Sequence, residues 1–471
     1  MPNPDLLFSA SIWAHQETGR VHLGDRRRTR RLVRVTAALV QKPAGTLPTT
    51  FSDWKTLRAA YRLFAEPDVT HKAITAPHIQ RVAQACHAPG EYLLVEDTST
   101  LSFNTHMATT DLGPVSDQGG HGFLVHNTLA LRVAGWDPDH VPTVTVVGLA
   151  GQHCWSRPKL GLKRKQKTKV ARLGRARESA RWAASLAAWL PAPAGVQWIY
   201  VADRESDIYE VFERCAARGA DWVIRAAQER ALVAQDRSVF SAVAQAPVRG
   251  HLAVELRARP GQPARSVRMA LRACTLTLRG PWRPGGRPAP RTLQVIEVRE
   301  VAPPTGTKPM VWVLLTSLPI STLAQIKRIV GCYTQRWLVE EFHKALKSGT
   351  QVEASQLATG RALQALCAVL SLVALRLLET KLYARAFPHQ PVQPGQFAPE
   401  LIQLLAAKLG RPRGGWTQRT VWRGIARCGG FMARKGDGEP GWITIWRGWR
   451  SLLNMVEGIV LHRTKQGRIC G

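Results

Sequence analysis

The sequence has few of the features that mark secreted, zinc-stabilised or membrane proteins. Its eight cysteines are scattered along 471 residues, without a Cys-x-x-Cys pair or a cluster of Cys and His at zinc-binding spacing, which argues against a disulfide scaffold and a zinc finger. Residues 1–20 lack a basic start followed by an apolar run, and the longest apolar stretch, 365–375, is too short to cross a bilayer. No internal repeat is present. We therefore expect a soluble protein without a leader peptide.

Acidic residues are also scarce. The chain has 33 Asp and Glu against 65 Lys and Arg, which gives a formal net charge of +32 and an isoelectric point near 10.9. Its share of hydrophobic residues, 45%, is ordinary for a globular protein. A positive excess spread over most of a chain repels itself unless a polyanion neutralises it. Nucleic acid is therefore the leading class of partner.

The order of secondary-structure patterns predicts three domains. Residues 1–70 read as basic helices, which suits either a small DNA-contacting unit or a solvated helix surface. Residues 71–385 alternate apolar runs with amphipathic segments, as in a layered α/β sheet, and a strand-rich stretch at about 226–317 predicts a β insertion. Residues 386–471 begin with a proline-spaced linker and are again helical. A dense run of Lys and Arg at 159–177 would add DNA affinity.

Two aspartates closely follow apolar strand patterns. Asp97 comes after the run 92–95, and Asp203 comes directly after the run 196–202. Carboxylates beyond the C-terminal ends of strands lie where α/β proteins commonly bind ligands. Each aspartate taken alone is nevertheless more typical of a turn cap than of a metal ligand. The interpretation as a metal site therefore depends on a third carboxylate.

Helical spacing in residues 333–347 supplies that carboxylate. At about 100° per residue, Glu340 falls on a polar face, Glu341 falls off it, and the apolar residues cluster on the opposite side. The polar face also carries Tyr333, Arg336, Lys344 and Lys347. Any amphipathic surface helix has a charged face, but this mixture suits a metal ligand flanked by phosphate contacts. Three converging carboxylates could hold two Mg²⁺ ions for an in-line phosphoryl transfer.

Three motifs give the chain a specific resemblance. They are Glu96-Asp-Thr-Ser-Thr-Leu-Ser102, Asp203-Arg-Glu-Ser-Asp-Ile208, and the signature that places Tyr333, Arg336, Glu340 and Lys347 at fixed spacing. These segments resemble the catalytic motifs of the DDE transposases of bacterial insertion sequences, in the IS4 family that includes the Tn5 transposase. The resemblance covers nearly the whole chain, from residue 23 to residue 449.

The resemblance implies an α/β fold with an RNase H-like catalytic core and an inserted antiparallel β subdomain. A helical N-terminal DNA-binding domain and a helical C-terminal dimerisation domain would flank the core. Asp97, Asp203 and Glu340 would be the catalytic residues and would bind two Mg²⁺ ions, for which Mn²⁺ would substitute. The reaction would be cut-and-paste transposition, through nicking, hairpin formation and opening, and strand transfer. A homodimer would act on terminal inverted repeats and target DNA, in the bacterial cytoplasm beside the nucleoid.

Further DNA-binding positions follow from the same resemblance. Trp312 matches the family tryptophan whose pocket receives a flipped base, and Trp337 lies beside it on the signature helix. Arg225 matches an arginine near the scissile phosphate. Arg31 and Arg62 match positions that bind the transposon end.

Two alternatives for the function stay open. A structure-specific nuclease on the same fold would share the three carboxylates, and a silent regulator descended from a transposase would bind DNA without cutting it. None of the three carboxylates is substituted, which favours an active enzyme.

Near the C-terminus, apolar residues at three-to-four spacing from 445 to 460 predict one buried helix face. That face fits an intramolecular contact and a subunit interface equally well.

Overall fold

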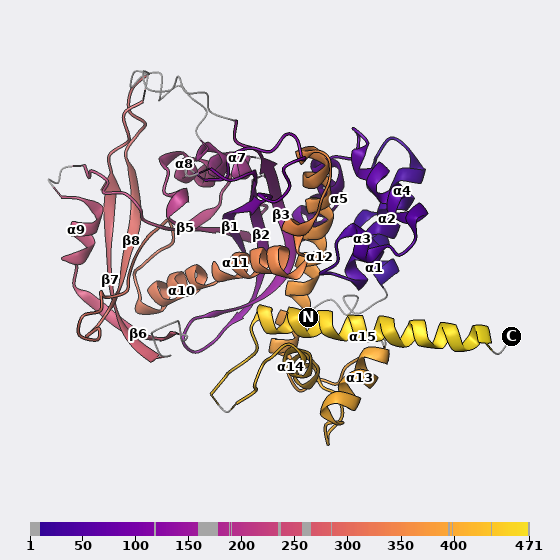
Figure 1. The fold of residues 1–471 in the computed structure, drawn as a ribbon. Helices are drawn as coiled ribbons and strands as arrows, with labels where there is room; N and C mark the ends of the chain where they lie inside the picture. Colours follow the sequence, from indigo (N-terminus) through magenta and orange to yellow (C-terminus); the bar gives the residue numbers. More distant parts are fainter. Residues whose placement is uncertain are drawn as a thin grey trace.

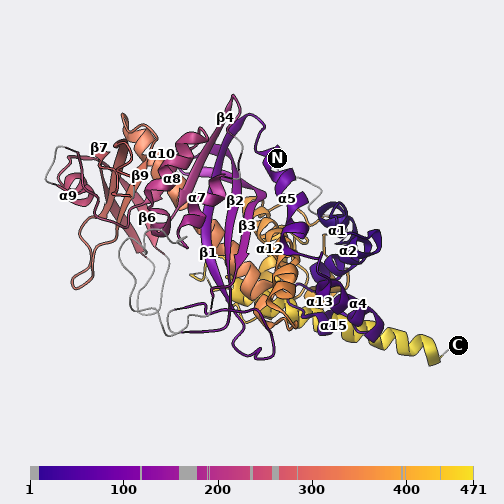
Figure 2. The same ribbon diagram turned by 90° about the horizontal axis from the view of Figure 1, so that it is seen from above.

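The computed structural model describes residues 10–116, 119–158, 178–187, 189, 191–233, 237–256, 265–283, 285–393, 396–397, 399–434 and 436–469. The predicted mixed α/β fold is confirmed, because a nine-stranded sheet forms the centre of the molecule with helices packed on it (Figure 1). The N-terminal helices and the strands at 248–316 lie at opposite ends of the molecule (Figures 1 and 2). The basic run at 159–177 lies outside the described residues.

Five strands form the first part of the sheet, in the order β3-β2-β1-β4-β5. They are β1 (Gly90–Ser102), β2 (Gly122–Trp136), β3 (Pro142–Trp155), β4 (Val196–Ala202) and β5 (Asp221–Arg225). The strands β1, β4 and β5 run parallel, whereas β2 is antiparallel to both β1 and β3. The short apolar run expected at 92–95 is therefore the start of a longer strand, since β1 continues beside β2 after its ladder with β4 ends.

Helices cover both faces of this sheet, so successive residues of β1 and β4 enter different hydrophobic cores. Leu93 and Val95 share a core with Leu338 and Phe342, on the helix that follows Arg336. Tyr92 and Leu94 pack instead with α7 (Ala180–Ala187) and α8 (Tyr209–Ala217). Burial on both faces explains why the central strands read as continuous apolar runs rather than as alternating ones.

The strand-rich stretch continues the sheet beyond β5. It contains β6 (Val248–Leu256), β7 (Arg265–Leu278), β8 (Arg291–Glu300) and β9 (Val311–Thr316), with α9 (Val239–Ala244) packed on β7 and β8. All four strands are antiparallel to their neighbours, and β9 pairs with β5. The added strands are thus continuous with the central sheet.

The N-terminal part is helical. It comprises α1 (Ala10–Thr18), α2 (Arg26–Gln41), α3 (Leu47–Thr50), α4 (Trp54–Ala65) and α5 (His71–Ala85). Side chains cap the first turns of three of them: Asp25 accepts from the Arg27 amide, Asp53 from the Thr56 amide and Thr70 from the Ala73 amide. Such caps satisfy amides that have no partner within the helix, typically worth about 1 kcal/mol each.

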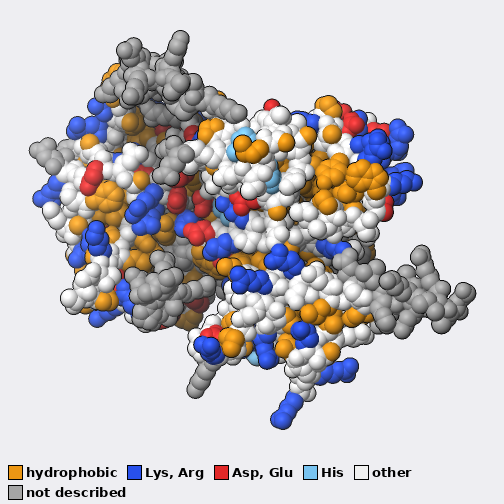
Figure 3. Space-filling model, viewed as in Figure 1, with side chains coloured by type: hydrophobic (Ala, Val, Ile, Leu, Met, Phe, Trp, Pro, Cys, Tyr) orange, Lys and Arg blue, Asp and Glu red, His pale blue; other side chains and the backbone are white. Residues whose placement is uncertain are grey.

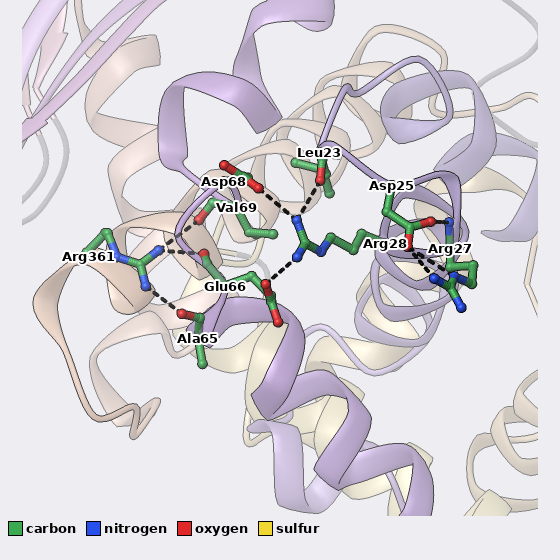
Figure 4. A network of polar contacts seen from close by, with 9 residues as sticks. All are labelled: Leu23, Asp25, Arg27, Arg28, Ala65, Glu66, Asp68, Val69 and Arg361. Carbon is green, nitrogen blue, oxygen red and sulfur yellow. Dashed lines mark hydrogen bonds and ion pairs between the residues drawn. The ribbon is translucent and has the colours of Figure 1, made fainter.

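Two arginines hold the segment between α4 and α5 from opposite sides (Figure 4). Arg28 of α2 donates to Asp68 Oδ2 at 2.8 Å and to Glu66 Oε2 at 2.5 Å. Arg361 donates to the carbonyl oxygens of Glu66 and Ala65, both at 2.7 Å. Because Arg361 belongs to the central helix of the molecule, these bonds fix the N-terminal helices on the core.

That central helix is α12 (Gly360–Ala386), and it corrects the length argument about membrane spans. The helix has 27 residues and an 18-residue window of mean hydropathy 1.8, so by length and composition alone it could cross a bilayer. However, 83% of that window is buried inside the protein. A helix that is apolar all round and buried is typical of the centre of a large domain.

The helix expected at 333–347 is divided into three. The structure has α10 (Leu323–Thr334), α11 (Trp337–Lys344) and a π-helical turn (Ala345–Gly349). At the junction, the amides of Gln335, Arg336 and Leu338 bond to carbonyls three residues earlier. This tighter 3₁₀ spacing turns the chain further per residue than an α-helix does. Tyr333 is consequently out of phase with Glu340, and its side chain is buried.

The C-terminal part contains α13 (Pro399–Leu409), α14 (Gln418–Cys428) and α15 (Trp442–Ile469). The first half of α15 packs on α14, where the rings of Trp422 and Trp449 stack with centroids 5.9 Å apart. Its later turns extend past the N-terminal helices toward the C-terminus (Figure 1). An intramolecular contact therefore accounts for the burial of Ile445, Trp446 and Leu452. The remaining short elements are 3₁₀ turns at Arg204–Ser206 and Val352–Ala354.

Candidate active site

Asp97 lies on β1, and Asp203 directly follows β4, the adjacent parallel strand. The ladder between β1 and β4 ends with the pair Val95 and Val201, and each aspartate is two residues further along its strand direction. Because side chains alternate along a strand, both carboxylates continue the face of these two valines. This is the face that α11 covers. The sheet register thus brings together the two aspartates that the sequence singled out.

Each aspartate also makes a local cap. One Asp203 carboxylate oxygen accepts from the Glu205 amide at 2.9 Å, and Asp97 Oδ1 accepts from the Thr98 amide at 2.8 Å. The turn-cap interpretation is therefore correct for the geometry of Asp203. A carboxylate has two oxygens with about four acceptor sites, so a single cap leaves capacity for a further partner.

Arg336 joins Asp97 to Glu340. Its Nη1 lies 3.5 Å from Asp97 Oδ2, and its Nη2 contacts Glu340 Oε1. The side chain of Glu340 is 42% exposed, whereas those of Asp97 and Arg336 are 17% and 20% exposed. Glu340 lies in the first turn of α11. The third predicted carboxylate is therefore linked to Asp97 through an arginine, and its charge acts on the pKa of Asp97.

The negative charges of the three carboxylates are not balanced by the single positive charge of Arg336. Burial, and after it the negative charge of Asp203, raises the pKa of Asp97 to about 7. Arg336 acts in the opposite direction, and the charge of Glu340 adds a smaller rise. A raised carboxyl pKa means that the ionised form lacks sufficient positive charge nearby. The cluster would therefore favour an additional cation.

The donor chemistry fits a hard divalent cation. Carboxylate oxygens are the ligands that Mg²⁺ and similar ions prefer, and such ions keep several waters. Within the part of the chain that the structure describes, no three Asp, Glu, His or Cys side chains already stand in ligand geometry. Arg336 contacts oxygens of Asp97 and Glu340 that an ion would use. Metal binding through these oxygens would thus require Arg336 to move away from them.

Glu96, the neighbour of Asp97, faces the opposite core. Its carboxylate accepts from Tyr200 and Thr128 at 2.6 Å each and lies 3.1 Å from His126 Nε2. The other imidazole nitrogen of His126 contacts the Thr98 hydroxyl at 2.9 Å. This buried network supports β1 from behind. Sequence reasoning missed it, because its members come from three strands.

The other residues of the signature do not form one exposed face. Lys344 is exposed and pairs with Glu341 at 3.3 Å, and Lys347 is half-buried in the π-helical turn. Tyr333 is a correction to the expected polar stripe, because it is buried with its ring 5.5 Å from that of Trp312. On the face shown in Figure 3, acidic side chains gather near the middle and Lys and Arg side chains border them.

The residues carried over from the resemblance lie in two places. Trp312 is half-buried near the start of β9, next to Val311, whose carbonyl accepts from Arg225 at 3.1 Å. Trp337 is half-buried at the first position of α11. Arg31 on α2 and Arg62 on α4 are exposed on the N-terminal helices. Their roles toward DNA stay predictions.

Glu341 lies off the exposed polar face, as the helical spacing predicted. It is buried, and it accepts from Lys381 of α12 at 2.6 Å and from the indole of Trp442 of α15 at 2.5 Å. The catalytic candidate Glu340 and its neighbour thus point to opposite sides of α11. Periodicity could predict that Glu341 leaves the polar face, but not which partners it meets.

Three family models match the chain, in order along the sequence. Residues 10–69 match the family described as Transposase DNA-binding, and residues 173–376 match Transposase DDE domain. Residues 404–467 match Transposase Tn5 dimerisation domain. The second match includes Asp203 and Glu340, whereas Asp97 precedes it. DDE transposase domains generally use divalent metal ions. The chain therefore belongs to the IS4-like DDE transposases related to Tn5, with a DNA-binding domain and a dimerisation domain.

Proposed function

We propose that the protein carries out cut-and-paste transposition with Asp97, Asp203 and Glu340 as its catalytic carboxylates. The observation that carries this proposal is the placement of both aspartates on one face of adjacent parallel strands, with Glu340 joined to Asp97 through Arg336. The strand order is β3-β2-β1-β4-β5, in which β1, β4 and β5 run parallel and β2 is antiparallel to β1 and β3. This arrangement supports an RNase H-like core. The strands β6 to β9 would be its inserted subdomain.

The three carboxylates would hold two Mg²⁺ ions, and Mn²⁺ would substitute. When bound, such a pair of ions supplies an activated nucleophile and charge stabilisation for the leaving oxygen. Arg336 and Lys344 would orient the scissile phosphate by charge-assisted hydrogen bonds. Lys347 and Arg225 would support phosphates near it, whereas Tyr333 is buried against Trp312. Positioning and charge neutralisation, rather than covalent chemistry by the protein, would drive each step.

The reaction would have four phosphoryl transfers. Water nicks the transposon end, and the freed 3′-OH attacks the opposite strand to form a hairpin. Water then opens the hairpin, and the 3′-OH attacks target DNA. Arg31 and Arg62 would bind the terminal inverted repeat, and a homodimer would pair two ends, in the bacterial cytoplasm beside the nucleoid. The matches at 10–69 and 404–467 support this function over a nuclease, which would need neither domain.

The substitution Asp203→Asn tests the catalytic assignment. It keeps the size of the side chain and its cap on the Glu205 amide, but it removes a metal-binding charge. We expect the nicking of end DNA in Mg²⁺ to fall at least about a thousandfold, as for the loss of a principal electrostatic group. Binding of the same DNA, measured by gel shift, should not change.

The matched control is Glu205→Gln. This acid is two residues away and exposed, and it contributes no carboxylate to the proposed trio. It should retain nicking within about threefold of the unchanged protein, since surface substitutions away from a site have small effects. If Asp203→Asn nicks DNA as well as Glu205→Gln does, Asp203 has no catalytic role.

The substitution Trp312→Ala tests the role in base flipping. Stacking on an aromatic side chain is worth about 1 to 3 kcal/mol per base, and extrusion relieves strain in a tight hairpin. We expect the variant to slow hairpin formation roughly tenfold or more while the first nick stays near its normal rate. Denaturing gels that separate nicked, hairpin and open products measure both steps. Equal slowing of nick and hairpin would assign Trp312 to the packing around Tyr333 instead.

A further inference from the structure

A chain of buried and half-buried amides and imidazoles runs behind the proposed catalytic site. Asn127 of β2 donates from Nδ2 to Nε2 of His343 on α11 at 2.9 Å, and both side chains are buried. Asn127 Oδ1 accepts from Gln152 Nε2 of β3 at 2.6 Å. Gln152 Oε1 in turn contacts His71 Nε2 of α5 at 2.8 Å. Four elements therefore meet through consecutive hydrogen bonds.

The bond between Asn127 and His343 joins the elements that carry the carboxylates. Asn127 is the direct partner of Asp97 in the antiparallel ladder of β1 and β2. His343 is three residues after Glu340, so it lies about one helical turn further along α11. The bridge thus ties the strand pair that holds Asp97 to the helix that holds Glu340.

The polarity of the bridge is fixed by its neighbours. The Val125 carbonyl oxygen, which can only accept, lies 3.5 Å from Asn127 Nδ2, so Asn127 Oδ1 is the atom that accepts from Gln152 Nε2. The Asn127 amide then has only its NH₂ group to offer to His343, which must accept through an unprotonated Nε2. Buried polar groups without such partners cost free energy, so this network specifies one arrangement of β2 and α11.

We propose that Asn127 and His343 are positioning residues, which set the separation of Asp97 and Glu340 at which the two carboxylates share a divalent cation. This inference rests on the proposed function. Arg336 spans the same gap on the accessible side, through oxygens that an incoming cation would take over. The buried bridge does not use those oxygens, so it persists when the cation is bound. Supporting residues of this kind typically change metal affinity or activity by about 10 to 100-fold when they are removed.

The first test compares His343→Leu with His343→Gln in the full chain. Leucine removes the acceptor and leaves the Asn127 amide unsatisfied, whereas the glutamine side chain offers an oxygen to the same donor. Calorimetric titration with Mn²⁺ should show at least about tenfold weaker binding for His343→Leu and near-normal binding for His343→Gln. The Mg²⁺ concentration for half-maximal nicking should rise in parallel, while gel-shift binding of end DNA stays unchanged.

Asn127→Ser provides a second variant in case His343→Leu does not fold. Serine is too short to reach His343 but leaves room for water near the remaining polar groups. It should also weaken Mn²⁺ binding by about tenfold. A loss below about threefold in Asn127→Ser, or an equal loss in His343→Gln and His343→Leu, would overturn the proposal.

Gln418→Leu is the matched control for general destabilisation. Gln418 is fully buried in α14 and exchanges two hydrogen bonds with Gln396, at 2.8 and 2.7 Å. Its loss should lower the melting temperature without changing Mn²⁺ affinity, so weakened Mn²⁺ binding here would also count against a specific role of the bridge.

The unchanged protein and Asp203→Asn separate this inference from the proposed function. If the unchanged protein does not nick DNA in Mg²⁺, the proposed function fails. If it nicks normally and the bridge variants bind Mn²⁺ normally, only the bridge is rejected.

Discussion

His71 illustrates how burial of a single titratable group makes stability depend on pH. Its ring lies at the start of α5 and contacts Gln152, and burial lowers its pKa from 6.5 to about 4. Between these values the unfolded chain binds a proton that the folded protein does not bind. The free energy of unfolding should therefore be highest above pH 6.5 and should fall as the pH drops toward 4, by roughly 1.4 kcal/mol per unit of pKa shift.

The substitution His71→Gln should remove this contribution. Urea unfolding at about pH 7 and about pH 5 gives the loss of stability for each protein. We expect the loss to be smaller in His71→Gln than in the unchanged protein, because glutamine does not titrate and can still bond to Gln152. The comparison cancels the effect of other acids that titrate over the same range. The same loss in both proteins would show that His71 titrates alike in the folded and unfolded states.

At this scale the sequence predicts which neighbouring carboxylates face different sides, but it does not predict their partners. Period-two alternation separates Asp97 from Glu96, and helical spacing separates Glu340 from Glu341. The contact of Arg336 with Asp97 joins residues 239 positions apart, and that of Asn127 with His343 joins residues 216 apart. Such contacts depend on the sheet register and on how α11 crosses the sheet, which no local pattern encodes.

Glu341 connects three helices. It belongs to α11, its ion pair reaches Lys381 of α12, and its hydrogen bond reaches Trp442 at the start of α15. The Lys381 ammonium also lies 3.9 Å from the centroid of the Trp442 ring. The side chains of Lys381 and Glu341 are only 5% and 8% exposed. The helix that carries Glu340 is therefore attached to the C-terminal helices by a buried charge pair.

The substitution Glu341→Gln should destabilise the protein by about 3 kcal/mol, because it leaves the buried Lys381 ammonium without its counter-charge. Denaturant unfolding measures this change. The double variant Glu341→Gln, Lys381→Met should recover most of it, since no unpaired charge remains. Glu439→Gln is the control, because this exposed acid pairs with Arg419 on the surface and its loss should cost less than about 1 kcal/mol. Equal costs for Glu341→Gln and Glu439→Gln would contradict the role of the buried pair.

Helices and strands were predicted well where their patterns are long and uniform. The strands β6 to β9, which lie within or close to the stretch predicted to be strand-rich, are examples. The break between α10 and α11 was not predictable, because neither glycine nor proline lies between Thr334 and Trp337. There the chain follows a tertiary contact, since the Tyr333 ring packs against Trp312 on β9. Packing of this kind overrides helical spacing.

At the scale of the whole molecule, the DNA-binding helices and the C-terminal helices are both fixed to α12. Arg361 holds the segment after α4 from one end of that helix, and Lys381 reaches Glu341 near the other end. The family matches place a DNA-binding function at 10–69 and a dimerisation function at 404–467. Because α12 is largely buried in the core, the core of the enzyme sets the position of one domain relative to the other.

The later turns of α15 belong to the matched dimerisation domain, and we predict that two protomers pair through them. Among the α15 side chains that the structure describes, the buried apolar ones are Trp442, Ile445, Trp446 and Leu452, which all precede Val456. The helix then extends past the N-terminal helices (Figure 1). A protein that ends at Val456 should therefore fold and bind one DNA end normally, but lose the complex of two ends. Mass photometry of the protein mixed with end DNA distinguishes these species. A protein that lacks only residues 470–471 is the control and should pair ends normally. Pairing by both proteins at the same DNA concentration would place the dimer contact outside the end of α15, on the helices α13 and α14 that share the matched dimerisation domain.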